Sequence, residues 1–435
     1  MTPSAIPPIA DTLGSVSNQE GGFPWAAVGE PYTAEDVIEV VRFLIQKGDE
    51  RYDDLLAAAE RAIRELAAHG RPPAKLTLGE RVAALERQVA ALLGARHCAF
   101  LTNATAGLEI AYRYANLSRG DEVIVPAITF IATAAYPLAV GARVVFADVE
   151  PRTLNLDPRD VERKLTRRTK VIVPVHLGGR PVDMDPLLEL ARHRGILVVE
   201  DAAHAFGAVY KGRQAGTLGH FGAFSFHEKK NVNSFGEGGI LVTDLPLGEK
   251  LRQARFLGME PGRKAANWIY DVVALEGVRG PFVAGNASST EIQAVGLAVQ
   301  LRRMEGILQE RRRGAEYLNA RFAASPVLCP ELPDTAEIRS THHLYLLQVN
   351  PQGGDVQKLK ERLAARGVAN IPHFAPLYKF ELLRRLGYDP KRCARGCPVA
   401  EEAFLHRFTH LPLHGLAGNR LAALADAVLA AAAEL

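Results

Sequence analysis

Cysteine is scarce in this sequence, with 4 residues among 435. So few thiols cannot supply a disulfide framework for a chain of this length, and we therefore expect a protein of the reducing cytoplasm. Cys393 and Cys397 lie four positions apart, but no matching pair of ligands lies near them in the sequence. We accordingly expect neither a zinc site there nor another metal site.

Long apolar runs and signal-like segments are also missing. No run approaches the roughly 18–20 apolar residues of a membrane-spanning helix. The N-terminus, Met-Thr-Pro-Ser-Ala-Ile-Pro-Pro, has neither a basic start nor an apolar core. The formal net charge is only +3, and the basic residues form no block. We therefore expect neither a membrane nor a nucleic acid as the main partner.

The composition that is present is that of an ordinary globular protein, with 48% apolar and 23% charged residues. A chain of 435 residues suits one large domain with a smaller one. The pattern predicts an N-terminal arm and helical segment (1–77), a large domain (78–287), a connecting helix (288–323) and a small C-terminal α+β domain (324–435). The long helical pattern of the third part is typical of a helix that joins two domains or lies in a subunit interface.

Short apolar runs alternate with helical segments between Cys98 and Thr243. This alternation indicates a mainly parallel sheet with helices on both faces. The strand candidates are Cys98–Thr102, Glu122–Val125, Arg143–Ala147, Lys170–Val173, Ile196–Val199, Ala223–Phe226 and Ile240–Thr243.

The stretch from Gly222 to Gly239 is the one around which the chain is organised. A strand candidate ends at Phe226, the adjacent Lys229 and Lys230 follow, and a glycine-rich turn precedes the next strand. A lysine in a loop hemmed by small residues can be partly desolvated, which lowers its pKa and makes it a nucleophile toward a carbonyl. Taken alone, the pair is more typical of two solvated lysines on a hairpin.

Three further loops follow strands at what should be the same edge of the sheet. Asn103-Ala-Thr-Ala-Gly107 opens a helix, whose free amides can bind a phosphate, although Thr105 could simply be an N-cap. Phe130 follows the second strand, where a single aromatic is more often part of the core. Asp201 follows a buried strand in Glu200-Asp-Ala-Ala-His204, where an acid can be functional or can cap a turn.

Together these loops supply a phosphate cradle, an aromatic plate, a carboxylate and an amine. Pyridoxal phosphate needs each of them: an anchor for its phosphate, a stacking partner for its ring, an acid beside its pyridinium nitrogen and a lysine for its aldehyde. The four loops taken together therefore favour pyridoxal phosphate over an independent structural role for each loop.

The sequence resembles the DegT-type family of pyridoxal phosphate-dependent sugar aminotransferases, from about Leu78 to His414. The blocks that carry the resemblance occur in the family's order. They are Gly120-Asp-Glu-Val-Ile-Val-Pro-Ala, Asp148-Val-Glu-Pro-Arg-Thr-Leu-Asn-Leu-Asp, Glu200-Asp-Ala-Ala-His-Ala, Ser225-Phe-His-Glu-Lys-Lys-Asn, Gly236-Glu-Gly-Gly, Gly285-Asn, Glu291-Ile-Gln-Ala and Leu411-Pro-Leu-His.

The resemblance implies fold type I, an α/β fold with a mainly parallel central sheet, helices on both faces and a smaller C-terminal α+β domain. It also implies a homodimer with active sites at the subunit interface. The amino group of glutamate or glutamine would pass to a nucleotide-linked keto sugar or a keto-cyclitol.

The site residues follow by matching the family's motifs. Lys230 would form the aldimine with the cofactor, Asp201 would pair with the pyridinium nitrogen, and His204 would lie near the phenolic oxygen. Phe130 would stack on the ring, and Asn286 would come from the partner subunit. The residues implied for the phosphate are Ala104, Thr105, Ala106 and Ser225.

Some of the chain departs from the family pattern. Ala104 stands where the family usually has glycine, and the segments 53–68 and 259–280 look like additions that could reshape substrate access. Candidates for the acceptor pocket are His227, Lys229, Trp268, His373 and Tyr378.

Three other functions are weighed against transamination. Sugar dehydratases on the same scaffold use pyridoxamine phosphate but carry histidine at the lysine position, so Lys230 argues against them. A nicotinamide oxidoreductase should show Gly-x-Gly-x-x-Gly after an early strand, and the sequence has none there. A non-catalytic regulator is disfavoured because every expected catalytic group is present.

Overall fold

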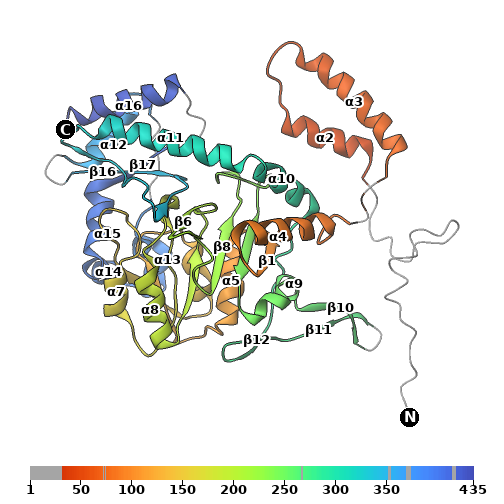
Figure 1. Ribbon diagram of the computed structural model, residues 1–435, viewed down its shortest axis with the longest axis horizontal. Helices are drawn as coiled ribbons and strands as arrows, with labels where there is room; N and C mark the ends of the chain where they lie inside the picture. The colour runs from red at the N-terminus through yellow and green to blue at the C-terminus, as the bar shows by residue number, and fades with distance from the viewer. Residues whose placement is uncertain are drawn as a thin grey trace. The chain divides into compact units, whose positions relative to one another are not determined.

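The computed structural model describes residues 32–71, 73, 75–265, 268–350, 354–368, 374–413 and 418–435. The contacts divide the chain into two units, residues 1–76 with 260–271 and residues 77–259 with 272–435. The first unit contains α2 (Ala34–Leu44), α3 (Tyr52–His69) and most of the hairpin of β10 (Met259–Ala265) with β11 (Trp268–Val272) (Figure 1).

A seven-stranded sheet forms the centre of the second unit, in the order β1-β9-β8-β5-β4-β2-β3. Its strands are β1 (His97–Leu101), β2 (Glu122–Pro126), β3 (Arg143–Ala147), β4 (Thr169–Ile172), β5 (Leu197–Asp201), β8 (Phe221–Ser225) and β9 (Gly239–Thr243). Only β9 runs against the others, because it pairs antiparallel with both β1 and β8. The mainly parallel sheet predicted from the sequence is confirmed, with each predicted strand within two residues of its observed position.

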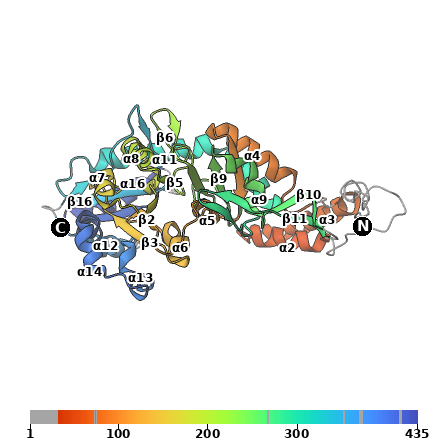
Figure 2. The ribbon, with the colours of Figure 1, turned by 90° about the horizontal axis from the view of Figure 1, so that it is seen from below.

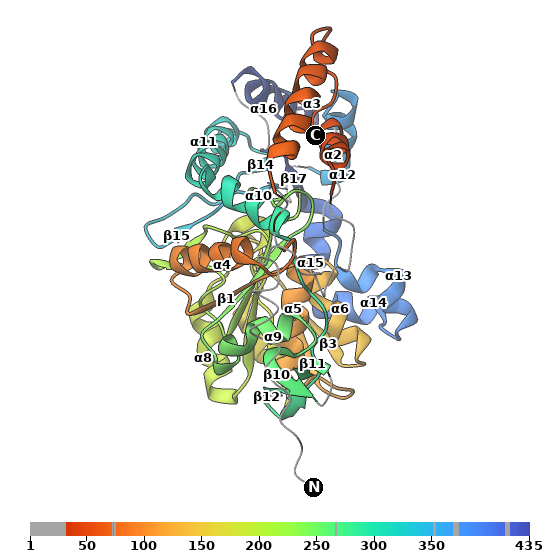
Figure 3. The ribbon, with the colours of Figure 1, turned by 90° about the vertical axis from the view of Figure 1, so that its right-hand side faces the viewer.

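Helices cover both faces of this sheet (Figure 3). On one face, Val123, Val199 and Leu241 pack with α5 and α6. On the other face, Phe100 and Ile240 pack with α4 and α10, and a further cluster on β4 and β5 packs with α7 and α8. The covering helices are α4 (Glu80–Leu93), α5 (Ala104–Tyr114), α6 (Ala132–Ala139), α7 (Pro158–Lys164), α8 (Met184–Arg194) and α10 (Glu291–Leu301). Because both faces are buried, the strands read as continuous apolar runs.

The predicted connecting helix is two helices, α10 and α11 (Met304–Phe322), interrupted at Arg302 and Arg303. A capping box of Thr290 and Gln293 starts the first of them, since each side chain bonds to the other residue's backbone amide. Apolar periodicity alone does not reveal a break of this kind.

The C-terminal elements gather at one end of the second unit around β16 (Figure 2). β14, β16 and β17 form an antiparallel sheet, which packs with α11, α12 and α16 around a core of its own. These elements are β14 (Leu328–Cys329), β16 (Tyr345–Val349), α12 (Val356–Ala365), α13 (Glu381–Arg385), α14 (Pro390–Gly396), α15 (Pro398–Glu402), β17 (Phe408–Leu411) and α16 (Asn419–Ala432). The domain boundary predicted at residue 324 stays a prediction.

Shorter elements complete the second unit. They are β6 (Val209–Tyr210), β7 (Arg213–Gln214), α9 (Leu251–Arg255), β12 (Leu275–Gly277), β13 (Gly280–Phe282), β15 (Ile338–Arg339), a π-helical turn at Ala403–Arg407, and 3-10 turns at Leu177–Gly179, Pro246–Lys250 and Leu377–Lys379. Within the described ranges, no helix is both long enough and apolar enough to cross a membrane. The expected cytoplasmic location stays a prediction.

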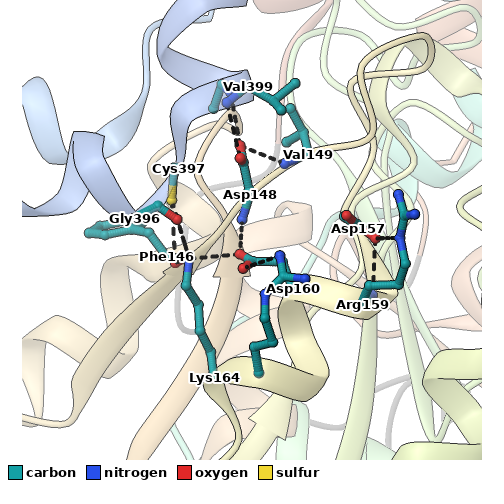
Figure 4. A network of polar contacts seen from close by, with 12 residues as sticks. Phe146, Asp148, Val149, Asp157, Arg159, Asp160, Lys164, Gly396, Cys397 and Val399 are labelled. Atoms are coloured by element: carbon teal, nitrogen blue, oxygen red, sulfur yellow. Dashed lines mark hydrogen bonds and ion pairs between the residues drawn. The ribbon is translucent and has the colours of Figure 1, made fainter.

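A buried carboxylate fastens α15 to the end of β3 (Figure 4). Asp148, 6% exposed, accepts the amides of Val399 at 3.0 Å and Ala400 at 2.8 Å. Lys164 of α7 strengthens the junction, because its Nζ donates to Asp160 at 2.7 Å and to the carbonyl of Gly396 at 2.6 Å. These contacts join β3 and α7 to helices more than 230 residues away in the sequence.

We expect Asp148→Ala to lower the free energy of unfolding by about 2–4 kcal/mol, because it leaves buried amides at the start of α15 without an acceptor. Asp157→Ala is the matched control, since Asp157 caps the amide of Arg159 at 3.0 Å and pairs with the guanidinium of the same residue at 3.3 Å, a loss of about 1 kcal/mol. Urea unfolding of both variants measures the difference. Equal losses would contradict this account of the junction.

Candidate active site

The carboxylate of Asp201 lies at the end of β5 and is fixed there by its neighbours. It is 5% exposed. Thr133, in α6, donates its hydroxyl to Asp201 Oδ2 at 2.7 Å, and the amide of Ala203 donates to Oδ1 at 3.2 Å. Both oxygens therefore have a fixed direction before any ligand binds.

Glu200, the residue before Asp201, supports this end of the sheet through buried hydrogen bonds. Its fully buried carboxylate accepts three amides of the following loop, Gly216, Leu218 and Gly219, at 2.6–2.7 Å. His176 lies 2.9 Å from the same carboxylate. Because His176 Nδ1 accepts the amide of Val182, its Nε2 carries the proton and donates the hydrogen bond to Glu200. Sequence reasoning left the role of Glu200 open, and the structure gives it a supporting one.

Lys230 lies in the turn after β8, the neighbour of β5 in the sheet. Burial lowers the pKa of its ammonium group to about 8, while the negative charges of Asp201 and Glu237 oppose the shift. Lys229, the adjacent lysine, is exposed. The structure thus distinguishes the two lysines, and it brings Lys230 within electrostatic reach of Asp201 at one edge of the sheet.

The N-terminus of α5 lies against the start of β9. Gly239 is required there, because a Cβ on it would lie 2.1 Å from the backbone carbon of Asn103 and 2.5 Å from the amide of Ala104. Ser225, at the end of β8, pairs in register with Gly239. The segment 104–106 and Ser225 therefore face the same small region. The amide of Ala106 already donates to Asn103 Oδ1 at 3.0 Å.

Phe130 and Asn286 are both exposed in a single chain. Phe130 lies between β2 and α6, three residues before Thr133, and is 61% exposed. Asn286 accepts the amide and the hydroxyl of Ser288 at 3.0 and 2.7 Å. An exposed aromatic at the carboxyl edge of a buried strand has its ring face free for another ring.

His204 is held in one tautomer by its surroundings. Its Nδ1 accepts the amide of Gly178 at 3.3 Å, so the proton lies on Nε2. Burial lowers the pKa of His204 well below its usual value, and the charge of Lys230 adds to the effect. The ring of His343 lies 4.4 Å away, centroid to centroid.

Sequence reasoning missed Thr133, Asn231 and His343. Asn231, directly after Lys230, donates to the carbonyl of Thr341 at 3.0 Å and accepts from His343 Nδ1 at 3.1 Å. This amide ties the lysine turn to the segment before β16. Thr133 could have been found from its place in the Phe130 loop, whereas nothing local marks the pairing of Asn231 with a residue 112 positions away.

Comparison with known proteins identifies the family of this chain. The model of the DegT/DnrJ/EryC1/StrS aminotransferase family matches residues 58–428. The chain belongs to that family. The match begins within α3, earlier than the resemblance read from the motifs.

Two curated relatives and one solved structure illustrate the likeness. The chain is 34% identical to GDP-perosamine synthase of Caulobacter vibrioides over 81% of this chain and 91% of that protein. It is 34% identical to UDP-N-acetyl-3-dehydro-alpha-D-glucosamine 3-aminotransferase of Acidithiobacillus ferrooxidans over 78% and 85%. The crystal structure of the aminotransferase TlmJ of Streptoalloteichus hindustanus aligns with a TM-score of 0.73 at 31% identity over 89% of this chain and 97% of that chain.

Family membership confirms the predicted enzyme class, a pyridoxal phosphate-dependent aminotransferase of fold type I. The residues of this aminotransferase fit the cofactor. They offer a partly neutral amine opposite a fixed carboxylate, a cradle beside α5 that a Cβ at Gly239 would fill, and an exposed ring at Phe130. The groups expected from the sequence thus come from several strands of one sheet edge.

The candidates for the acceptor pocket have mixed outcomes. Tyr378 was wrongly included, because it is fully buried and its hydroxyl donates to Glu401 at 2.8 Å. His227 is half-buried and lies 3.8 Å from Glu237. His373 lies outside the described residues, as does the side chain of Trp268.

The pKa of Lys230 gives a pH-dependent prediction. The neutral amine becomes the main form as the pH rises through about 8, so acylation of Lys230 in the cofactor-free aminotransferase should be half-maximal there. Asp201→Asn removes a charge that stabilises the ammonium form, and the midpoint should move to lower pH. Mass spectrometry of the labelled peptide measures the profile, and Lys229→Ala should leave it unchanged. A midpoint that stays or rises in Asp201→Asn contradicts the coupling.

Proposed function

We propose that this sugar aminotransferase moves the amino group of glutamate or glutamine to a keto sugar carried on a nucleotide, or to a keto-cyclitol, with Lys230 as the residue that binds the cofactor covalently. The observation that carries the proposal is the half-buried amine of Lys230, with a pKa of about 8, within the field of the fixed Asp201 carboxylate. The two relatives named for nucleotide sugars support the choice of acceptor.

Pyridoxal phosphate, when bound, supplies an aldehyde for the amine and a ring that accepts the electrons of the breaking C–H bond. Lys230 acts twice in this proposal. As a neutral amine its Nζ would hold the aldehyde covalently, with water as the leaving group, and as a free base the same Nζ would move a proton between the reacting carbons. A pKa of about 8 suits both tasks, because the amine is then available in both protonation states near neutral pH.

Asp201 would keep a proton on the ring nitrogen. Its two oxygens are already directed by Thr133 and Ala203, so the remaining lone pairs have a set orientation. The Nε2–H of His204 would donate to the phenolic oxygen, since its Nδ1 is occupied by Gly178. Each group would therefore reach the ligand in one set orientation.

The phosphate would lie at the start of α5. The backbone of Ala104, Thr105 and Ala106 and the hydroxyl of Ser225 surround that region, and the positive end of the helix dipole favours an anion. Because the Ala106 amide is committed to Asn103, the amides of Ala104 and Thr105 would carry most of the binding.

A second subunit would complete each active site. Phe130 would stack on the cofactor ring, and Asn286 would serve the partner's site. The exposure of both residues in one chain supports a homodimer with shared active sites.

Lys230→Ala should abolish both transamination and the covalent attachment of the cofactor. Glutamate production from 2-oxoglutarate and a panel of nucleotide-linked amino sugars and amino-cyclitols measures the first, and it also identifies the acceptor. Absorbance in the near-visible band, or borohydride trapping followed by mass spectrometry, measures the second.

Lys229→Ala is the matched control and should retain the covalent attachment, because that side chain is exposed. If Lys230→Ala retains the covalent attachment, or if Lys229→Ala alone loses it, Lys230 is not the residue that binds the cofactor covalently.

Asp201→Asn should reduce the rate of transamination by about 10²–10⁴-fold, since an amide cannot hold the ring proton as a carboxylate does. Thr133→Val should cost about tenfold, the value of one hydrogen bond of roughly 1.4 kcal/mol, and Thr133→Ser should restore most of it. Steady-state kinetics with circular dichroism as a check of the fold distinguish these effects from unfolding. A near-normal rate in Asp201→Asn would remove its proposed role.

A further inference from the structure

The first unit contains a helical hairpin, α2 with α3, none of whose residues belongs to the candidate active site. Its helices α2 and α3 run antiparallel, because Glu35 at the start of α2 pairs with Arg64 near the end of α3 at 2.7 Å. Arg42 pairs with Glu60 further along. Thr33 and Asp36 form a capping box at the entry of α2, so the local sequence specifies the hairpin well.

This hairpin has almost no core of its own. Ile38, 1% exposed, is the buried residue of α2, and α3 has none. Two helices of 11 and 18 residues are marginal in water unless an apolar face is covered. The hairpin therefore needs a partner surface.

Each helix carries an exposed apolar stripe. On α2 the stripe consists of Val37, Val40 and Leu44, which are 46, 57 and 55% exposed. On α3 it consists of Leu55 and Leu66, 58 and 72% exposed, with the exposed Ala59 and Ala62 between them. The spacing of three, four and seven residues places each set on one side of its helix.

The two stripes lie on the same side of the hairpin. Ile38 on α2 and Ile63 on α3 are among the residues that face the other helix. Each residue advances about 100° around its helix, so on both helices the facing residues lie about a quarter turn past the apolar stripe in the N-to-C direction. Because the helices are antiparallel, a quarter turn of the same sense brings both stripes to one side. The Glu35–Arg64 pair lies a quarter turn beyond the facing residues, on the opposite side. One side of the hairpin is thus apolar and the other charged.

The apolar stripe of α3 has a spacing that reads the same in both directions. Leu55, Ala59, Ala62 and Leu66 are separated by four, three and four positions. A two-fold axis through the middle of α3 would place Leu55 against Leu66 of a second copy, and Ala59 against its Ala62. The small central residues would let the helices approach closely, with the leucines packed at both ends.

We propose that the α2–α3 hairpin is a self-association module, whose apolar side docks on the same side of a second copy to form an antiparallel four-helix bundle. The palindromic spacing favours a second copy over an unrelated partner. The charges disfavour a membrane surface, because acidic residues outnumber basic ones between residues 32 and 71, whereas surface-bound helices are usually rich in Lys and Arg.

Cysteine cross-linking of the full-length chain tests the docking. In Leu55→Cys/Leu66→Cys the two positions of one chain are 11 residues apart, about 16 Å along the helix, so they can form disulfides only between copies. Oxidation with diamide, which accepts the two electrons and two protons of the thiol pair, should give a product of twice the chain mass at micromolar concentration.

Ala58→Cys/Glu65→Cys is the matched control on the face of α3 directed away from α2. It should give at most one tenth of that product after subtraction of the wild-type background. Equal yields from the two pairs, or no dimeric product from Leu55→Cys/Leu66→Cys, would overturn the proposal, because another occupant would then cover the apolar side.

A second pair of variants tests the contribution of α2 in the same cross-linking background. Val40→Glu places a charge on the apolar side and should reduce the yield at least tenfold. Phe43→Glu should leave it within twofold, because Phe43, 75% exposed, lies on the far side of α2. An unchanged yield in Val40→Glu would overturn the proposed bundle. Neither result depends on transamination, so this inference and the proposed function can fail separately.

Discussion

The opposition between burial and charge at Lys230 is the interaction on which the rest of the site depends. Burial favours the neutral amine, and the carboxylates of Asp201 and Glu237 favour the ammonium form, so that the pKa lies at about 8. Without burial the amine would stay protonated. Without the carboxylates its pKa would fall further, and the neutral amine would be a weaker base. The balance requires that β5 and β8 be neighbours, because each delivers one of the two groups from its carboxyl end.

Several buried contacts keep this edge of the sheet in shape. Glu200 gathers the loop after β7 through three amides, and Gly239 allows the start of α5 to approach β9. Asn231 ties the lysine turn to the segment before β16, so the C-terminal elements contribute to the site although they are remote in sequence. These residues touch no reacting atom, yet they fix the directions of those that would.

The α2–α3 hairpin is stabilised in a different way from the second unit. Its helices are specified locally, by caps and by ion pairs on one side, but they bury too little to be stable alone. The second unit buries a large apolar core between the central sheet and the helices on both of its faces. The hairpin leaves its apolar side exposed, and this exposure is the physical basis of the proposed association between copies.

The sequence by itself determined the class of the fold and the candidate chemistry. Continuous apolar runs identified all seven strands of the central sheet, and the polar residues after them included Lys230, Asp201 and His204, because a parallel sheet places functional groups at its carboxyl ends. Tertiary structure alone decided which groups meet. The Thr133 hydroxyl on Asp201, the Asn231–His343 pair, the break after α10 and the burial of Tyr378 depend on strand order and packing between distant segments, and no local pattern records these.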